Sequence, residues 1–235
     1  MSKDEKLKAL AILVKKRRKT KMTNEYSKCK NISYASPKFD SDMHGYKYCV
    51  TPITKGACNV ESRVMFVLND WMSVDGVSRV NSDGKMDDLV ELGYKDWGGT
   101  AATNTKLNKN IIGNHLNLRR EDVFITNIFS FIKPGGMEDI IPPLALIKGL
   151  EFFEEQMNIV QPRVIFILGG TSKRVFCDYF YNNDLYNITN KNISGCSISN
   201  KSLSCNVFFM KHPRVYDQND WDKLLDLNKI IMSII

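Results

Sequence analysis

Residues 161–180 read QPRVIFILGGTSKRVFCDYF, and the fold class can be inferred from this one stretch. The run Val164–Leu168 is apolar and rich in β-branched side chains, which is typical of a strand that is buried on both faces. Two glycines follow it, and Thr171 can cap a helix that extends to Tyr179. A buried strand that leads through a glycine turn into a helix is typical of a parallel βαβ unit.

The same strand pattern occurs three more times along the chain. The further predicted strands are Val64–Leu68, Val123–Thr126 and Val207–Met210. Helix-length segments accompany them, and we expect helices at Glu5–Val14, Asn104–Asn117, Pro142–Val160 and Asn219–Ile234. Since strands alternate with helices, the sequence predicts a three-layer α/β/α sandwich with a central four-stranded parallel sheet. The polar stretch Asn182–Ser204 indicates a loop or short hairpin, and residues 22–60 show no clear order of elements.

The excess positive charge is confined to the N-terminus. Residues 1–24 contain nine Lys or Arg and two Asp or Glu, so their net charge of +7 equals that of the whole chain. We therefore expect two parts, a basic N-terminal arm at 1–24 and a globular domain at 25–235. The central basic side chains of the arm, which suit a DNA phosphate backbone, are Lys15, Lys16, Arg17 and Arg18. The alternative is a solvated tail that only aids solubility.

Polar residues follow each predicted strand. They are Asn69 and Asp70 after the first strand, Asn127 after the second, Gly169–Ser172 after the third and His212 after the fourth. Ligands of a parallel sheet bind beyond the carboxyl ends of its strands, so these groups should converge at one edge. Taken singly, each also has an ordinary structural explanation. Asp70 or Asn127 can cap a turn, and His212 can be a loop residue.

Four segments, in this order, resemble the uracil-DNA glycosylase superfamily and especially its family 4 branch. They are Arg120–Asn127, Lys133–Gly136, Gln161–Thr171 and Val207–Pro213. The resemblance implies that residues 25–235 form a glycosylase-like domain. The motif Phe66–Met72 departs from family 4. In an ungapped alignment, Asp70 falls on the catalytic aspartate of family 1 enzymes, Asn69 on their glutamine and Met72 on their tyrosine.

The resemblance implies roles in catalysis and base recognition. Cleavage of a pyrimidine N-glycosidic bond produces an oxocarbenium-like sugar and an anionic base. Asp70 would stabilise that sugar and orient water, while His212 would donate a hydrogen bond to the O2 of the departing base. Asn127 would read the Watson–Crick edge of the flipped base, and Trp97 would stack on it unless it is a core residue. Asn69 and Met72 would also face the base, and Met72, in place of a blocking tyrosine, leaves room for a larger 5-substituent.

The resemblance also implies DNA contacts on two loops. Backbone N–H groups at the start of a helix suit a phosphate, and those expected to serve here belong to Gly170, Thr171 and Ser172. The residues after the histidine would enter the minor groove, and these are Arg214, Val215 and Tyr216. Either Tyr216 or Val215 would fill the vacated base stack.

No cofactor and no metal are expected. The six cysteines include no C-x-x-C pair, and none lies in Ile128–Gln156, where the family 4 resemblance would place cluster ligands. The three histidines do not have metal-ligand spacing. The N-terminus lacks a secretory signal, and no apolar run is long enough to span a bilayer. We therefore expect a cytoplasmic, monomeric enzyme whose partner is DNA and not a membrane.

These features together predict a monofunctional DNA glycosylase that acts on uracil or on a larger 5-modified pyrimidine. Removal of uracil would serve DNA repair, whereas removal of a modified cytosine from viral DNA would serve antiviral defence. The alternative is a catalytically silent nucleic-acid-binding protein with the same fold, although Asp70, Asn127 and His212 are all present. A nucleotide-binding α/β protein is disfavoured, because the chain contains neither G-x-x-x-x-G-K-[ST] nor G-x-G-x-x-G.

Overall fold

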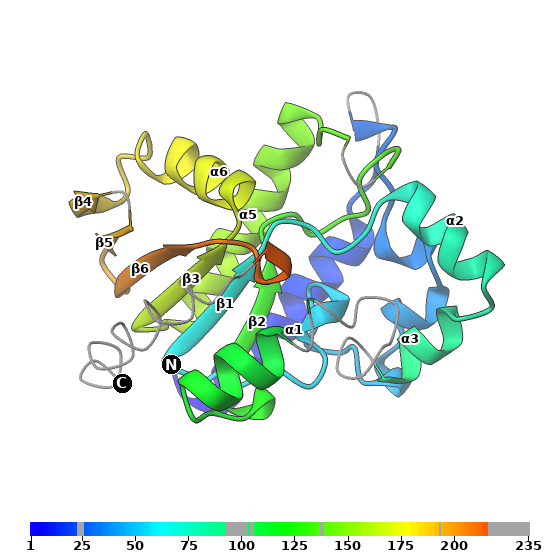
Figure 1. The fold of residues 1–235 in the computed structure, drawn as a ribbon, viewed down its shortest axis with the longest axis horizontal. Coiled ribbons are helices and arrows are strands. Elements are labelled where there is room, and N and C mark those ends of the chain that lie inside the picture. The colour runs from blue at the N-terminus through cyan, green and yellow to red at the C-terminus, as the bar shows by residue number, and fades with distance from the viewer. Residues whose placement is uncertain (23–25, 93–102, 104–105, 137–138, 193, 216–235) are drawn as a thin grey trace.

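The computed structural model describes residues 1–22, 26–92, 103, 106–136, 139–192 and 194–215 (Figure 1). At its centre is a six-stranded sheet with the strand order β2-β1-β3-β6-β5-β4. The strands are β1 (Val64–Leu68), β2 (Phe124–Asn127), β3 (Val164–Leu168), β4 (Asn187–Asn192), β5 (Gly195–Ser199) and β6 (Ser204–Met210). The predicted α/β class is confirmed.

The sheet is mixed and not purely parallel. β2, β1, β3 and β6 are parallel to one another, as the alternation of strands and helices predicts. The prediction of only four strands is wrong, because β4 and β5 form an antiparallel hairpin that extends the sheet beyond β6. β5 buries Cys196 and Ile198. Its backbone also pairs with β6, whose N–H and C=O groups would otherwise lie unpaired at an edge.

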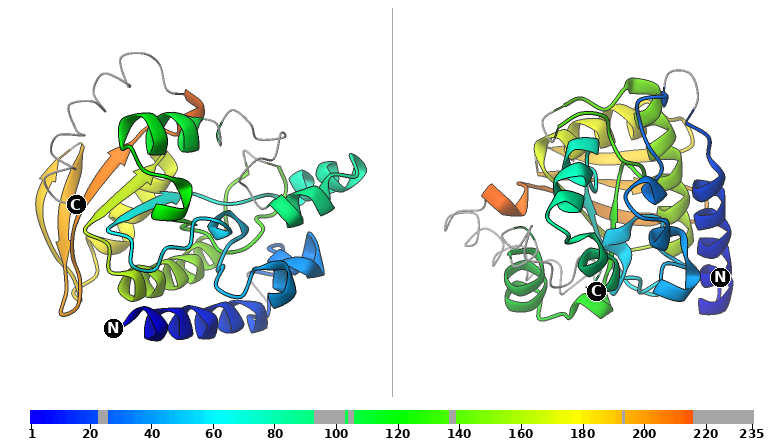
Figure 2. Two further views of the ribbon diagram at one scale, coloured as in Figure 1. Left: turned by 90° about the horizontal axis from the view of Figure 1, so that it is seen from below. Right: turned by 90° about the vertical axis from the view of Figure 1, so that its right-hand side faces the viewer.

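Helices cover both faces of the sheet (Figure 2). One face carries α1 (Lys3–Lys19), α5 (Pro143–Val160) and α6 (Gly170–Phe180), and the core of the other face includes α2 (Val74–Ser82), α3 (Met86–Leu92) and a π-helix at Lys106–His115. Short 3-10 turns occur at Ile32–Tyr34, Pro37–Asp40, Asp42–His44, Pro52–Thr54, Arg120–Asp122 and Pro213–Val215. The predicted helix Asn219–Ile234 lies outside the described residues. In the described ranges, no helix has the length and apolar character needed to cross a membrane.

The strand β1 shows how the sheet separates two cores. Met65 and Val67 pack in the core that α1, α5 and α6 share, whereas Phe66 and Leu68 pack in the core on the opposite face. Every residue of the strand is buried. A polar side chain on such a strand would be buried on either face, so the first polar residues follow its carboxyl end.

The predicted basic arm is a packed helix. Leu10, Leu13 and Val14 of α1 are buried against the core of α5 and α6, and burial of each contributes roughly 1.5–3 kcal/mol. Lys6 Nζ donates to the carbonyl oxygens of Val60 and Val160, at 3.2 and 2.6 Å. Both views of Figure 2 place α1 alongside α5. The helix therefore shares one hydrophobic core with residues beyond position 24.

Candidate active site

A cavity of about 230 Å3 opens beyond the carboxyl ends of β1 and β3. Asn69 and Asp70 enter it from the end of β1, and Thr171 and Arg174 enter it from α6. The remaining lining residues are Lys133, Asp139, Ile140, Ile141, Leu146 and Val175. This is the edge of the sheet at which the sequence predicts a ligand.

The loops after β1 and β2 run side by side past the edge of the sheet. Ile128 N–H donates to Leu68 O, and Phe129 N–H donates to Asn69 O, both at 2.8 Å. Further along, Lys133 N–H donates to Met72 O at 3.2 Å. These backbone bonds continue the pairing of the two strands beyond the sheet. They place Lys133 beside the residues that follow β1.

Asp70 forms a buried ion pair at the wall of the cavity. Its Oδ2 lies 3.5 Å from Lys133 Nζ, and the two side chains are only 8% and 5% exposed. Asn69 Nδ2 donates to the same oxygen at 2.7 Å. Burial raises the pKa of Asp70 above its ordinary value, and Lys133, Asn69 and His212 each act to lower it. The carboxylate form of Asp70 therefore depends on these neighbours.

His212 follows β6 and is held against the glycine turn that follows β3. Gly169 N–H donates to Met210 O at 2.8 Å. A Cβ on Gly169 would lie 3.6 Å from His212 Cβ, and the φ of Gly169 is +102°. The turn needs glycine for its backbone conformation, whereas a Cβ at this position would make only an ordinary van der Waals contact with the histidine. It also makes Gly169, and not the predicted Thr171, the residue that precedes α6.

The protonation state of His212 follows from its surroundings. Burial and Arg214 lower the pKa of His212, against an opposing effect of Asp70. The neutral form of the imidazole is therefore favoured at pH 7. The backbone N–H of Arg214 donates to His212 Nδ1 at 3.3 Å. That bond assigns the proton to Nε2, so the ring can donate a hydrogen bond from Nε2.

Asn127 ends β2 with a buried amide that has no partner among the described residues. The residue is fully buried, and neither its Oδ1 nor its Nδ2 makes a hydrogen bond with any described residue. Asn127 lies opposite Leu68 in the register of β1 and β2. The residue after Leu68 is Asn69, whose Oδ1 is also buried and has no partner among the described residues. Leaving a buried polar group unsatisfied costs about 1–3 kcal/mol. The amide is thus suited to a ligand that can both donate and accept.

Of the other residues predicted to face the base, Met72 lies away from the cavity. Met72 is buried and packs against Gly76 in the first turn of α2, and it is not among the described residues that line the cavity. Trp71 packs edge-on against Phe39, with ring centroids 5.0 Å apart. Trp97 lies outside the described residues. Met72 therefore meets the core of α2 and not the cavity.

The predicted DNA-contacting residues have different environments. Gly170, Thr171 and Arg214 are exposed, and Val215 is 61% exposed on the 3-10 turn after His212. Ser172 is buried, and its hydroxyl donates to Leu168 O at 3.0 Å, which leaves only its backbone N–H for a phosphate. Tyr216 lies outside the described residues.

The four basic residues of α1 also differ from one another. Lys15 is exposed, and Lys16 is exposed but pairs with Glu155. Arg17 is buried, with its Nη2 2.8 Å from Asp40 Oδ1. Arg18 pairs with Asp42 at 3.0 Å. The prediction that Arg17 contacts a phosphate is therefore wrong, because its side chain is buried and its charge is paired with Asp40.

Lys133 is the site residue that the sequence analysis missed. It ends a run of buried residues, Ile128–Ile132, that follows β2. A lysine in such a run needs a buried anion as partner, and this is the signal that could have identified it. Asp139 and Arg174 also line the cavity without having been predicted.

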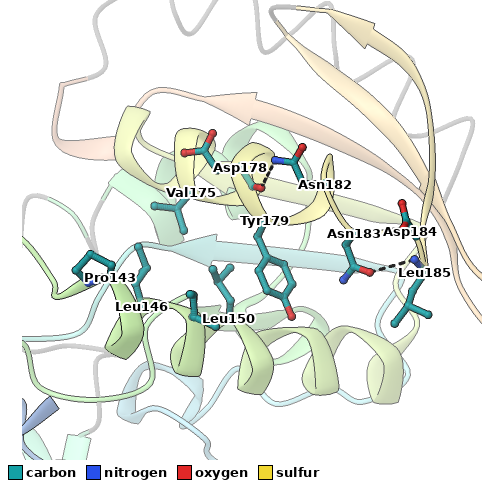
Figure 3. Close-up of a pocket in the computed structure, with 11 residues that line it drawn as sticks. Pro143, Leu146, Leu150, Val175, Asp178, Tyr179, Asn182, Asn183, Asp184 and Leu185 are labelled. Atoms are coloured by element: carbon teal, nitrogen blue, oxygen red, sulfur yellow. Dashed lines mark hydrogen bonds between the residues drawn. The ribbon is translucent and has the colours of Figure 1, made fainter. Parts of the chain in front are cut away.

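A larger cavity, of about 680 Å3, lies between α5 and α6 (Figure 3). Leu146, Leu150 and Val175 contribute its apolar surface. Its amide and hydroxyl groups are used within the protein, since Asn182 Nδ2 donates to Asp178 O, Asn183 Oδ1 accepts from Leu185 N–H and Tyr179 OH donates to Glu154. We therefore place the candidate active site in the smaller cavity. No described group of His, Cys, Asp and Glu residues is arranged to hold a metal ion.

Comparison with known proteins supports one family. The model of the uracil DNA glycosylase superfamily matches residues 93–230, which is more than half of the chain. The match includes Asn127, Lys133, the glycine turn at Gly169 and His212, whereas Asn69 and Asp70 precede it. A search of curated proteins finds no match.

Proposed function

The chain belongs to the uracil DNA glycosylase superfamily, whose members are DNA glycosylases, and from this we propose a monofunctional enzyme that acts on a flipped-out pyrimidine in DNA. The reaction would hydrolyse the N-glycosidic bond and leave an abasic site. The observation that carries the proposal is the buried amide of Asn127, which has no partner among the described residues and lies at the same sheet edge as Asp70 and His212. Such an arrangement leaves recognition and bond-cleaving groups ready for one small ligand.

The chemistry assigns a task to each group. As the glycosidic bond breaks, the sugar gains positive charge and the base gains negative charge. The carboxylate of Asp70 would stabilise the sugar and orient the attacking water. The neutral imidazole of His212 would donate from Nε2 to the base oxygen on which charge develops. Neither step needs a cofactor.

The amide of Asn127 supports a pyrimidine as substrate. It offers two N–H donors and a carbonyl acceptor, and the edge of uracil or cytosine presents one donor beside one acceptor. An amide satisfies either base according to its orientation. The proposal therefore includes uracil and larger 5-modified pyrimidines, among them a modified cytosine of viral DNA. A uracil substrate would indicate DNA repair, and a viral base would indicate defence.

The surrounding surface supports binding to DNA. The start of α6 exposes Gly170 and Thr171, and a helix N-terminus favours a phosphate. Val215 is an exposed apolar side chain three residues after the catalytic histidine, where a wedge would replace the flipped base. We propose that the turn Pro213–Val215 inserts into the duplex.

A glycosylase assay tests the proposal. The protein is incubated with DNA duplexes that each carry one uracil or one 5-modified pyrimidine, and alkali then converts abasic sites into strand breaks. We expect breaks at one or more of these bases, and none with the double variant Asp70→Asn/His212→Ala. Tight binding of every duplex without cleavage would instead support the catalytically silent DNA-binding protein.

A further inference from the structure

The buried lysine beside Asp70 has a role that the superfamily match does not assign. We propose that Lys133 is a positioning residue that keeps Asp70 ionised and fixes its carboxylate at the wall of the smaller cavity. This inference rests on the proposed glycosylase function. It concerns how the catalytic carboxylate is prepared, and not which base is removed.

The geometry shows that the lysine is held in place from both sides. Its backbone N–H donates to Met72 O at 3.2 Å, and its carbonyl accepts from Val74 N–H at 2.9 Å. The side chain is almost fully buried and reaches back along the loop to Asp70, with 3.5 Å between Nζ and Oδ2. Two backbone bonds, to Met72 and to the first residue of α2, thus fix the backbone of Lys133 beside the segment that carries Asp70. The backbone of the site therefore holds both members of the Asp70–Lys133 ion pair near each other.

Other charged groups near Asp70 are less able to do this. The neutral form of His212 is favoured at pH 7, because burial and Arg214 lower the pKa of the imidazole. Asp139 and Arg174 line the same cavity, but Asp139 is an anion and the Arg174 side chain is exposed. Burial alone raises the pKa of Asp70, and Lys133 is the largest influence that opposes it. Loss of Lys133 would leave a buried carboxylate that takes up a proton.

A pH-rate profile tests the proposal. Single-turnover cleavage requires ionised Asp70, so its acid limb reports the pKa of that carboxyl. Removal of the lysine in Lys133→Gln or Lys133→Met raises this pKa, so the acid limb should move to higher pH by ~1–3 units. Cleavage should then fall at neutral pH and recover as the pH rises. Lys133→Arg keeps a cation and should leave the limb near its original position.

A matched control separates this effect from a general loss of charge. Lys148 lies on α5, pairs with Glu151 and is not among the residues lining the active-site cavity. Lys148→Met should leave the acid limb unchanged. If Lys133→Gln lowers cleavage equally at every pH, or leaves it unchanged, the positioning role is wrong.

Two further measurements keep the inference distinct from the proposed function. Carbon NMR of the Asp70 carboxyl should show a higher pKa in Lys133→Gln than in the parent protein, whether or not any DNA is cleaved. An unchanged carboxyl pKa would overturn the positioning role, whereas a raised pKa without glycosylase activity would overturn only the proposed reaction.

Borohydride trapping of the protein on cleaved DNA should yield no covalent complex. A complex that is lost in Lys133→Arg would show that the amine attacks the sugar, which contradicts the positioning role.

Discussion

Two cavities share a wall in this protein, and they differ in how their polar groups are satisfied. Leu146 and Val175 line both of them. The larger lies between α5 and α6, and its amide and hydroxyl groups already bond within the protein. The smaller is lined by the buried pair of Asp70 and Lys133 and by Asn69, whose Oδ1 is buried and has no hydrogen-bond partner among the described residues. Unsatisfied buried polarity, and not volume, therefore identifies the candidate active site.

The largest expected effect comes from one substitution made in each cavity. Asp70→Asn removes the charge that stabilises the sugar, so we expect single-turnover cleavage to fall by ~10²–10⁴-fold while DNA binding persists. Asp178→Asn is the matched change on the wall of the larger cavity. It should alter cleavage by no more than about twofold, as for a surface substitution. Near-full activity in Asp70→Asn would show that the smaller cavity is not the catalytic one.

The histidine at the same sheet edge should have the next largest effect. His212→Ala removes a preorganised donor, and such a loss typically lowers the rate by roughly 10²–10³-fold. His44 is a suitable control, because it pairs with Glu91 on the surface. His44→Ala should leave cleavage unchanged, and thermal unfolding should show that both variants remain folded. A His212→Ala protein that is merely unstable, with a normal rate when folded, would support a structural role for the histidine.

Asn127 offers a sharper form of the comparison, because its neighbour Thr126 has a satisfied side chain. Thr126 Oγ1 donates to Gln156 at 2.7 Å, whereas the Asn127 amide has no partner in the described residues. Asn127→Ala should therefore lower kcat/KM by ~10–10²-fold and change the free energy of unfolding little. Thr126→Val should do the reverse, destabilising the fold by ~1–3 kcal/mol while kcat/KM is retained. Chemical denaturation and steady-state kinetics on both variants check this. Equal losses of stability in Asn127→Ala and Thr126→Val would mean that the Asn127 amide contributes to the fold and is not kept for a ligand.

The smallest effect on activity is expected in the larger cavity. Leu150 is buried on α5 and contributes to its apolar wall. Leu150→Ala should destabilise the protein by ~2–5 kcal/mol through the space it creates. The rate per folded molecule should stay within about twofold of the parent value. A loss of base discrimination in this variant would mean that the two cavities act as one site.

Short-range patterns were enough to predict much of the fold. The strands Val64–Leu68 and Val164–Leu168 were predicted to the residue, because a strand buried on both faces is a continuous apolar run. α5 was predicted within one residue at its start, since a proline marks it. The hairpin of β4 and β5 was not placed in the sheet, because its polar sequence, Asn187–Ser199, offers few buried apolar residues.

Part of the candidate site could also be predicted from position along the chain. Asp70, Asn127 and His212 each follow a predicted strand, and parallel strands bring their carboxyl ends to one edge. Met72 could not be placed in this way. Alternation beyond the end of a strand does not say whether a side chain turns toward the cavity or toward α2.

The identities of the polar residues and the positions of the parallel strands along the chain can thus be predicted locally, since they depend on hydrophobic periodicity and on the direction of the chain. The partners of the buried charges were not. Lys133 lies 63 residues after Asp70 and Asp40 lies 23 residues after Arg17, and both pairs form only because folding removes those charges from water. A charge in a solvated chain needs no partner, whereas a buried one does. The tertiary structure alone decides which partner is within reach.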